Sequence, residues 1–506
     1  MIGGAYILVV VGILLAKGLG FVRDMVFAGA FGTATASDIY FQVFGLVNLI
    51  FTGLGVALST LVIKNLNKAE NHGNEIGYAA AFLRKSCLFM TVCAALVALC
   101  AKPIVHLILP NLSGADFDLA VRMMYIMSPS LIFVVLAYII SGLLQNKQVY
   151  FVTSIMSLPF NVAIILSLLP GETSITTVGI VTTIGWFLHI VIQLPQFFKN
   201  GYSLTASGKK QISTSKNPEI LWIFVSNMMF QLCVYIDRAF VSEAEGMAST
   251  FNYASNLFIT IASVFVVAMS TVVFPSISKN YEEGHMAYVK ELVQYIISIM
   301  FTIFLPFILV VAFFGGDVIR LVYERGEFTS YDTAAVSLIF LLYTLGALGY
   351  VAQELLNKVL YLAGKYKHTV IATVSVVVLN LLLNFVFSVL CSDRLVFGMS
   401  LSAILSAAST ALLMNIYAVV IALSMKKVIG NYITAALLAD LSKILFSGVV
   451  ASGVYLLCNL CIPEITHGYI SFVLPLCACG IAYGGMLLCT GMLKKLLKRE
   501  KKEVQS

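Results

Sequence analysis

Long apolar stretches, separated by short polar segments, run along the whole chain. Most extend for roughly 20 residues or more, enough for one helix to cross the hydrocarbon core of a bilayer. They are continuous rather than alternating, which favours helices over the shorter, alternating strands of a membrane β-barrel. The expected fold class is an all-α polytopic membrane protein. Fourteen spans are predicted, at about residues 4–23, 37–63, 79–101, 119–143, 150–169, 177–197, 218–241, 251–275, 288–314, 332–361, 368–390, 396–425, 435–459 and 467–492.

A short string in the second span is repeated in the eighth. Residues 56–63 read VALSTLVI and residues 267–274 read VAMSTVVF, an offset of 267 − 56 = 211 residues. A weaker echo relates residues 97–108 to residues 311–322. The offset covers six spans, an even number, so the two halves are predicted to be parallel repeats with one orientation. Internal repeats of this kind are typical of transporters, whose substrate site lies between them.

The repeat predicts five parts of the chain. Residues 1–199 form a first six-helix lobe, residues 200–217 a polar cytoplasmic loop and residues 218–427 a second six-helix lobe. Residues 428–492 add two spans outside the duplication, and residues 493–506 form a basic cytoplasmic tail. The first apolar stretch lacks the basic start and the small-residue cleavage site of a secretory signal, so we expect it to be retained as a span.

Composition and charge agree with this organisation. The chain of 506 residues is 60% hydrophobic and 11% charged, whereas soluble domains are about one quarter charged. Lysines and arginines gather at alternate span ends and in the tail, which puts both termini in the cytoplasm. The net charge of +7 reflects that bias, so nucleic acid is not an expected partner. No phosphate-binding loop, metal-ligand cluster or catalytic motif is found, so we expect neither an enzyme nor a cofactor.

Charged residues inside the spans are the strongest site candidates. A charge at mid-bilayer costs about 2.5–3.5 kcal/mol on insertion scales, and it persists chiefly where it faces a cavity or a partner. An arginine fork matches a phosphate group, which favours an anionic substrate in a cationic cavity. For Arg23 and Arg238, a simpler interpretation stays open, in which the side chains reach the headgroups. The candidates are Lys17, Arg23 and Asp24 in span one, Asp38 in span two, and Asp237 and Arg238 in span seven.

A second set of charges lies nearer the cytoplasmic side. Glu354 and Lys358 are four residues apart in span ten, and Asp440 is three residues from Lys443 in span thirteen. Spacings of three and four place side chains on one helix face, so internal ion pairs are the preferred interpretation. Asp237, Glu354 and Lys358 are also candidates for gating, or for coupling to the membrane potential or to a monovalent cation.

Three segments resemble one known family. The first reads KGLGFVRD at residues 17–24, followed by FG at 31–32 and SDIYF at 37–41. The second reads YERGEFTSYDT at residues 323–333, and the third combines NYASNL at 252–257 with FPSISK at 274–279. These segments are similar to those of the MurJ (MviN) family of the multidrug/oligosaccharidyl-lipid/polysaccharide (MOP) exporter superfamily. The resemblance extends over essentially the whole chain.

The resemblance implies a function. Proteins of this family flip lipid II, the peptidoglycan precursor, from the inner to the outer leaflet of the bacterial cytoplasmic membrane by alternating access. It implies a cationic central cavity and a groove for the lipid tail formed by spans thirteen and fourteen. It also implies a monomer whose partners are a lipid-linked glycan, membrane lipids and, as a candidate, the cell-wall synthesis machinery. By position the cavity residues are Lys17, Arg23, Asp24 and Asp38, while the arginine of span eight is Asn256 here.

Three other functions are left open by the sequence. The family's arginine pair in span two is replaced by residues 48–52, NLIFT, which leaves room for another lipid-linked cargo such as a capsule, teichoic acid or O-unit precursor. An ion-coupled drug antiporter would need a carboxylate in a compact apolar pocket rather than the cations of span one. A non-transporting scaffold for envelope assembly would not need Lys17 and Arg23, which are costly in a membrane if unused.

Overall fold

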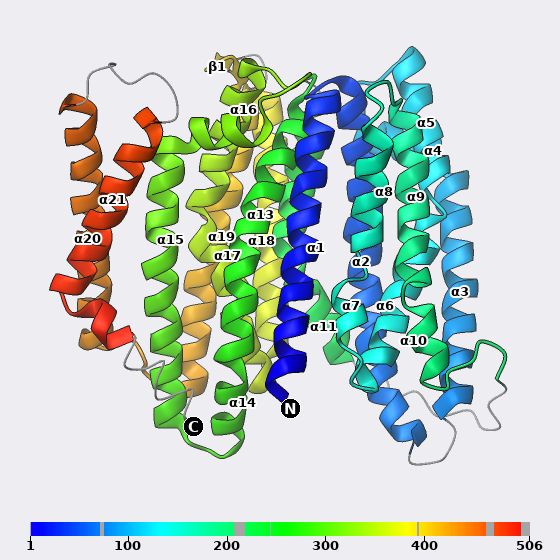
Figure 1. Ribbon diagram of the computed structural model, residues 1–506, viewed down its shortest axis with the longest axis horizontal. Coiled ribbons are helices and arrows are strands. Elements are labelled where there is room, and N and C mark those ends of the chain that lie inside the picture. Colours follow the sequence, from blue (N-terminus) through cyan, green and yellow to red (C-terminus); the bar gives the residue numbers. More distant parts are fainter. Residues whose placement is uncertain are drawn as a thin grey trace. The chain divides into compact units, whose positions relative to one another are not determined.

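The computed structural model describes residues 2–70, 75–206, 218–242, 244–391, 394–461 and 470–496. These residues are almost entirely helical and fall into two compact units (Figure 1). Unit 1 comprises Met1–Tyr253, Tyr323–Asp332 and Asn384–Ala403, and unit 2 comprises Ala254–Val322, Thr333–Leu383 and Ile404–Ser506. The division into lobes, loop and tail made from the sequence stays a prediction. Residues 207–217 of the predicted loop and residues 497–506 of the predicted tail lie outside the described residues.

Unit 1 contains the helices from the first half of the chain. It also contains the beginning of α13, the short antiparallel hairpin of β1 (Leu395–Val396) and β2 (Met399–Ser400), and the helix ends on either side of that hairpin. Its complete helices are α1 (Ile2–Phe31), α2 (Thr35–Glu70), α3 (Glu75–Leu99), α4 (Ala101–Ile108), α5 (Gly114–Met127), α6 (Ser130–Asn146), α7 (Phe151–Ser154), α8 (Leu158–Leu168), α9 (Ile175–Val191), α10 (Leu194–Lys199), α11 (Pro218–Asn227) and α12 (Met229–Val241).

Unit 2 contains most of the second half. Five helices, α13, α15, α16, α18 and α19, have residues in both units, and α15 contributes only its last residue, Tyr323, to unit 1. The helices of the second half are α13 (Met247–Val272), α14 (Phe274–Glu282), α15 (Met286–Tyr323), α16 (Ser330–Leu345), α17 (Ala347–Leu362), α18 (Tyr366–Cys391), α19 (Leu401–Ile429), α20 (Ala435–Cys461) and α21 (Ile470–Cys489).

The fourteen predicted spans fall on helices or on consecutive helices, except that span twelve begins in the β1–β2 hairpin. Residues 467–469 of span fourteen lie outside the described residues. Among the described residues, nine segments are long and apolar enough to cross a membrane, or ten if the pair α16–α17, bent by 45°, forms one span. The other four predicted spans correspond to α1, α2, α11–α12 and α21. The chain is thus an all-α polytopic membrane protein, and the crossing of those four segments stays a prediction.

Proline can kink a helix, and we compare four prolines that lie within or at the ends of predicted spans. Pro159, Pro195 and Pro275 each lie in the first turn of a new helix, namely α8, α10 and α14. A first-turn proline removes an N–H group that has no helical partner in any case, so it starts the helix at little cost. Pro306 lies inside α15, which continues through it. Three of the four prolines therefore mark breaks between helices.

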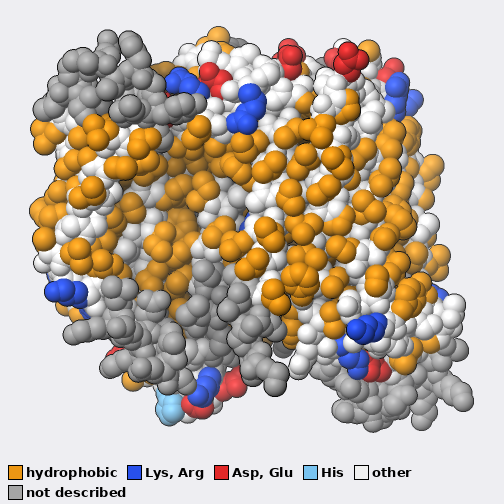
Figure 2. Space-filling model, in the orientation of Figure 1, with side chains coloured by type: hydrophobic (Ala, Val, Ile, Leu, Met, Phe, Trp, Pro, Cys, Tyr) orange, Lys and Arg blue, Asp and Glu red, His pale blue; other side chains and the backbone are white. Residues whose placement is uncertain are grey.

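The polarity of α18 is that of a helix facing lipid. Thr369, Thr373, Asn380 and Asn384 are fully buried and recur at spacings of three to four residues or their sums, which places them on one helix face. Apolar side chains such as Phe385, which is 58% exposed, point outward. Figure 2 shows hydrophobic side chains gathered over the outer surface of the helices, with charged side chains towards the helix ends. Apolar surface of this extent indicates a lipid environment.

In unit 1, α2 is the central helix. It packs against α3, α5, α6 and α9 from the first part of the chain and against α11 and α12 from the later part. Helix α1 packs along α7 and α8, and α8 in turn packs against α9 (Figure 1). The candidate residues of α1 and α2 are therefore surrounded by helices far apart in sequence.

Candidate functional site

The charged turn of α1 is held by a neighbouring helix. The Arg23 guanidinium donates from Nε and Nη2 to Asp24 Oδ1, at 3.0 and 2.7 Å, and from Nη1 to Asn161 Oδ1 of α8, at 3.2 Å. Asn161 is buried and donates in turn to the carbonyl of Ala16 on α1, at 3.4 Å. One amide thus binds both the backbone of α1 and its arginine.

Arg23 retains hydrogen-bonding capacity. A guanidinium carries five N–H groups, and three of them make the bonds to Asp24 and Asn161. Two have no acceptor among the residues that the structure describes. The Arg23 side chain is 18% exposed and that of Asp24 is 10% exposed. A partly buried fork with two spare donors can receive oxygens of an anion, and such charge-assisted bonds are the strong ones.

An aromatic group lies beneath the guanidinium. Cζ of Arg23 is 5.5 Å from the ring centroid of Phe160, within the range of a cation–π interaction. Phe160 itself packs against Trp186 and His189 of α9, at centroid distances of 5.3 and 5.6 Å. These three aromatic side chains are buried. The ring beneath Arg23 is therefore fixed by a packed core.

Sequence reasoning found Lys17, Arg23 and Asp24 but missed Asn161. Lys17 is half-buried on α1, and Asp24 is buried beside the arginine that it binds. A signal for Asn161 exists, because it is a polar residue in the apolar string of α8, and polar residues at membrane depth are costly unless partnered. Its partner, 138 residues away, is not visible from the sequence.

Asp38 caps a distant helix. Its Oδ2 accepts from the backbone N–H of Gly246 at 2.7 Å, and its Oδ1 accepts from the backbone N–H of Ser249 at 2.6 Å. These N–H groups lie just before and in the first turn of α13, where a helix has donors without internal partners. A carboxylate there satisfies them and also complements the positive end of the helix dipole. Asp38 is 5% exposed in this conformation.

Further hydrogen bonds join three segments around Asp38, which we call the turn cluster. The segments are Gly29–Asp38, Glu245–Tyr253 and Tyr323–Asp332. Its bonds run from Glu327 N to Gly29 O (3.0 Å), from Tyr253 Oη to Gly32 O (2.9 Å), from Thr35 Oγ1 to Glu245 Oε1 (2.7 Å) and from Thr33 Oγ1 to Asp332 Oδ1. Every hydrogen bond in this set joins the turn between α1 and α2 to one of the other two segments.

The segment Tyr323–Asp332 is shaped for this contact. Gly326 has φ +58°, and a Cβ there would lie 2.1 Å from the carbonyl oxygen of Gly29, so only glycine allows the two backbones to approach. Asp332 Oδ2 accepts from Thr329 N at 2.7 Å, and Thr329 Oγ1 accepts from Asp332 N at 3.4 Å, which together form a capping box at the start of α16. Residues from all three segments that carried the family resemblance thus meet in the turn cluster.

Asp237 and Arg238 are both buried in α12. Asp237 accepts from Asn384 Nδ2 at 2.9 Å, and Arg238 Nη1 donates to Asn252 Oδ1 at 2.7 Å. The Arg238 guanidinium also lies over the ring of Tyr235, with Cζ 5.4 Å from the centroid. Arg238 is 7% exposed. This conformation buries Arg238 among protein side chains, and its expected contact with a substrate stays a prediction.

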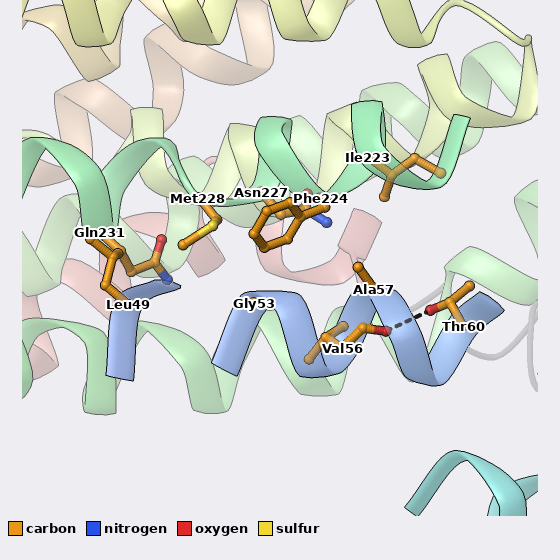
Figure 3. Close-up of a pocket in the computed structure, with 10 residues that line it drawn as sticks. All are labelled: Leu49, Gly53, Val56, Ala57, Thr60, Ile223, Phe224, Asn227, Met228 and Gln231. Carbon is orange, nitrogen blue, oxygen red and sulfur yellow. Dashed lines mark hydrogen bonds between the residues drawn. The ribbon is translucent and has the colours of Figure 1, made fainter. Parts of the chain in front are cut away.

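A neutral pocket lies between α2 and the α11–α12 break (Figure 3). Its volume is about 290 Å³. A Cβ on Gly53 would lie 2.1 Å from the Phe224 ring, so this glycine lets the ring rest on the backbone of α2. No lining residue is charged, so the pocket suits an uncharged ligand rather than a phosphate group. It is lined by Leu49, Gly53, Val56, Ala57, Thr60, Ile223, Phe224, Asn227, Met228 and Gln231.

The remaining candidates lie in unit 2. Asn256 of α13 and Glu354 and Lys358 of α17 are half-buried. Lys358 Nζ donates to Ser270 Oγ at 2.6 Å and lies 5.8 Å from the ring centroid of Phe274. Their expected roles in binding, gating and coupling stay predictions.

One predicted ion pair is wrong. Buried Asp440 pairs with Lys495, which follows α21, rather than with Lys443 on its own helix. Lys443 is exposed. A spacing of three residues permits contact on a helix but does not require it, and here the cation that reaches the buried carboxylate comes from beyond α21.

Comparison with known proteins gives relatives along most of the chain. A probable lipid II flippase MurJ of Buchnera aphidicola subsp. Acyrthosiphon pisum is 23% identical over 388 residues, covering 73% of this chain and 75% of that protein. The lipid II flippase MurJ of Burkholderia cenocepacia is 23% identical over 395 residues, covering 74% and 76%.

Solved structures confirm the fold. The lipid II flippase MurJ in an inward closed conformation aligns with a TM-score of 0.75 at 22% identity, covering 97% of this chain and 99% of that one. A multidrug resistance MATE family transporter of the MOP superfamily, in an inward-facing conformation, aligns with a TM-score of 0.63 at 13% identity, covering 82% and 96%. The family model described as lipid II flippase MurJ matches residues 27–475. By this match over most of its length, the chain belongs to the MurJ lipid II flippase family.

Proposed function

We propose that the chain carries lipid II from the inner to the outer leaflet of the bacterial cytoplasmic membrane by alternating access. The observation that supports this most is the Arg23 fork, which is fixed by Asp24 and Asn161 and keeps two N–H donors free of described acceptors. Lipid II carries a pyrophosphate, which is the kind of group that an arginine fork binds. Family membership does not favour the antiporter or the scaffold interpretation.

The Arg23–Asp24 pair fits a site that must bind and then release an anion. Asp24 offsets the charge of Arg23 and holds the guanidinium in one orientation, so little side-chain freedom remains to be lost on binding. Partial burial strengthens bonds to an incoming anion, because the local dielectric constant is lower than that of water. Lys17 lies on the same helix and supplies further positive charge.

The turn cluster acts as a closure in the proposed cycle. With both termini in the cytoplasm, as the lysine and arginine distribution predicts, this cluster lies on the outer side. Opening there requires Asp38 to leave the N–H groups of Gly246 and Ser249. Each hydrogen bond to a charged group is worth about 1.5–3 kcal/mol. Cargo binding must offset this cost for the outer side to open.

The energy source and the assembly state belong to the same proposal. The chain works as a monomer, and its transport is coupled to the membrane potential or to a monovalent cation. Asp237 is a candidate for that coupling, because it is a buried carboxylate in the span that corresponds to α1 in the sequence repeat. The cell-wall synthesis machinery is its candidate protein partner.

Complementation tests the proposed function. Cells depleted of their own lipid II flippase would express the wild-type chain, Arg23→Ala or, as a control for arginine removal, exposed Arg122→Ala, at matched levels. We expect growth with the wild type and Arg122→Ala and lysis with Arg23→Ala. Lysis with a well-expressed wild type would contradict lipid II as the cargo.

A further inference from the structure

Asn161 is the residue outside α1 whose side chain is hydrogen-bonded to the Arg23 guanidinium. It lies on α8, 138 residues from Arg23 in sequence, and it is 4% exposed. Its Oδ1 accepts from Arg23 Nη1 at 3.2 Å while its Nδ2 donates to Ala16 O at 3.4 Å. One planar amide therefore fixes both the distance between α8 and α1 and the direction of the arginine.

The space around Asn161 is suited to this double contact. A Cβ on Gly20 would lie 3.8 and 3.9 Å from the two terminal atoms of the Asn161 amide, so the amide lies against a face of α1 that carries no side chain at that point. Phe160, the preceding residue, places its ring 5.5 Å from Arg23 Cζ. Two consecutive residues of α8 thus contact the guanidinium, one at its edge and one within cation–π range.

The chemistry of Asn161 matters as well as its position. A neutral amide oxygen accepts a hydrogen bond without adding negative charge, so it orients Arg23 and leaves its charge for an anionic ligand. Asp24 already supplies one carboxylate, at 2.7 Å. A second carboxylate on the guanidinium would compete with the pyrophosphate for the same donors.

We propose that Asn161, supported by Phe160, is a positioning residue that aims the free edge of Arg23 at the pyrophosphate of the cargo. Asn161 itself does not touch the cargo, and its contribution acts through Arg23. The inference rests on the proposed function and adds α8 to the recognition site. It predicts that substitutions at Asn161 change the affinity for cargo only while Arg23 is present.

Binding of fluorescently labelled lipid II to the purified full-length protein in nanodiscs tests this. We expect Asn161→Leu, which keeps the side-chain size but loses the acceptor, to weaken affinity about tenfold. In an Arg23→Ala background, the same substitution should change affinity less than twofold. Thr182→Val removes another buried hydrogen bond of unit 1, the 3.0 Å bond to Tyr40, and should leave affinity unchanged.

A second variant keeps the test decisive if Asn161→Leu does not fold. Asn161→Asp keeps an acceptor oxygen and adds charge, so we expect normal yield with an affinity at least fivefold weaker. The positioning role would be overturned if every Asn161 variant that folds bound lipid II with wild-type affinity. It would also be overturned if a variant lost as much lipid II affinity in the Arg23→Ala background as in the wild type. A wild type that binds lipid II no better than undecaprenol would instead contradict the proposed function.

Discussion

Arg23 and Asp38 belong to adjacent helices and were both expected in one cavity, yet their surroundings differ. Both carboxylate oxygens of Asp38 accept backbone N–H groups of the α13 start. Arg23, by contrast, uses three of its five donors, and its side chain is 18% exposed. Charge within a membrane protein therefore does not identify a binding residue by itself. What distinguishes the two is whether the hydrogen-bonding capacity has already been used within the protein.

The comparison separates two kinds of defect. Removing Arg23 should chiefly weaken recognition of the cargo. Removing Asp38 should destabilise the closed turn cluster and leave recognition intact. The following predictions proceed from the largest expected effect to the smallest.

Arg23→Ala should reduce lipid II affinity by more than about 100-fold, because two charge-assisted bonds of about 1.5–3 kcal/mol each are lost and every 1.4 kcal/mol is about tenfold in affinity. Arg23→Lys should lose about tenfold, since the charge remains while the planar fork is absent. Equilibrium binding in nanodiscs measures both. Equal affinity of Arg23→Lys and wild type would show that the fork geometry is not used.

Asp38→Ala should lower the free energy of unfolding by about 3 kcal/mol, because two backbone N–H groups lose a charged acceptor. Thermal unfolding of the purified protein measures the change, with exposed Asp118→Ala as the control. Lipid II affinity should stay within twofold of the wild type. A tenfold loss of affinity with unchanged stability would assign Asp38 to the binding site.

Gly326→Ala should destabilise the protein by about 2 kcal/mol, from the left-handed conformation together with the close contact to Gly29. Gly284→Ala is a matched control, because Gly284 has φ +78° but no atom within 4 Å of an added Cβ. The difference between the destabilisation by Gly326→Ala and that by Gly284→Ala measures the contribution of the close contact between the backbones of Gly326 and Gly29. Equal shifts in unfolding temperature would indicate that backbone conformation alone is responsible.

Thr35→Val should have the smallest effect, within about 0.5 kcal/mol of the wild type. The bond from Thr35 to Glu245 is exposed, so water replaces it readily. Thermal unfolding and growth complementation should both match the wild type. A clear growth defect of Thr35→Val would mean that the exposed rim of the turn cluster also controls transport.

Much of the fold could be predicted from the sequence, because each membrane span is a local property of about 20 apolar residues. The positions of Arg23 and Asp24 on α1 were predictable for the same reason. Their partners were not, since Asn161 contacts Arg23 only after α8 packs against α1. The role of Asp38 depends on backbone groups 208 and 211 residues away. The periodicity of apolar residues along the chain does not predict contacts between residues so far apart in sequence.

The sequence does contain one local signal for the start of a helix in the turn cluster. The string from Thr329 to Asp332 has the spacing of a capping box and predicts the start of α16, which the structure confirms. The sequence showed it only as part of a family motif. The docking of this box on Thr33 is a tertiary contact, so the sequence could predict the cap but not its partner.

The central claim is that Arg23 binds the cargo while Asp38 controls the outer closure. The most direct test measures lipid II affinity and transport in the same proteoliposome preparations for the wild type, Arg23→Lys and Asp38→Asn. We predict that Arg23→Lys loses about tenfold in affinity. Asp38→Asn should bind normally but transport more slowly, because the weakened outer closure re-forms less readily after the cargo has left. Normal binding by Arg23→Lys together with lost binding by Asp38→Asn would contradict the account.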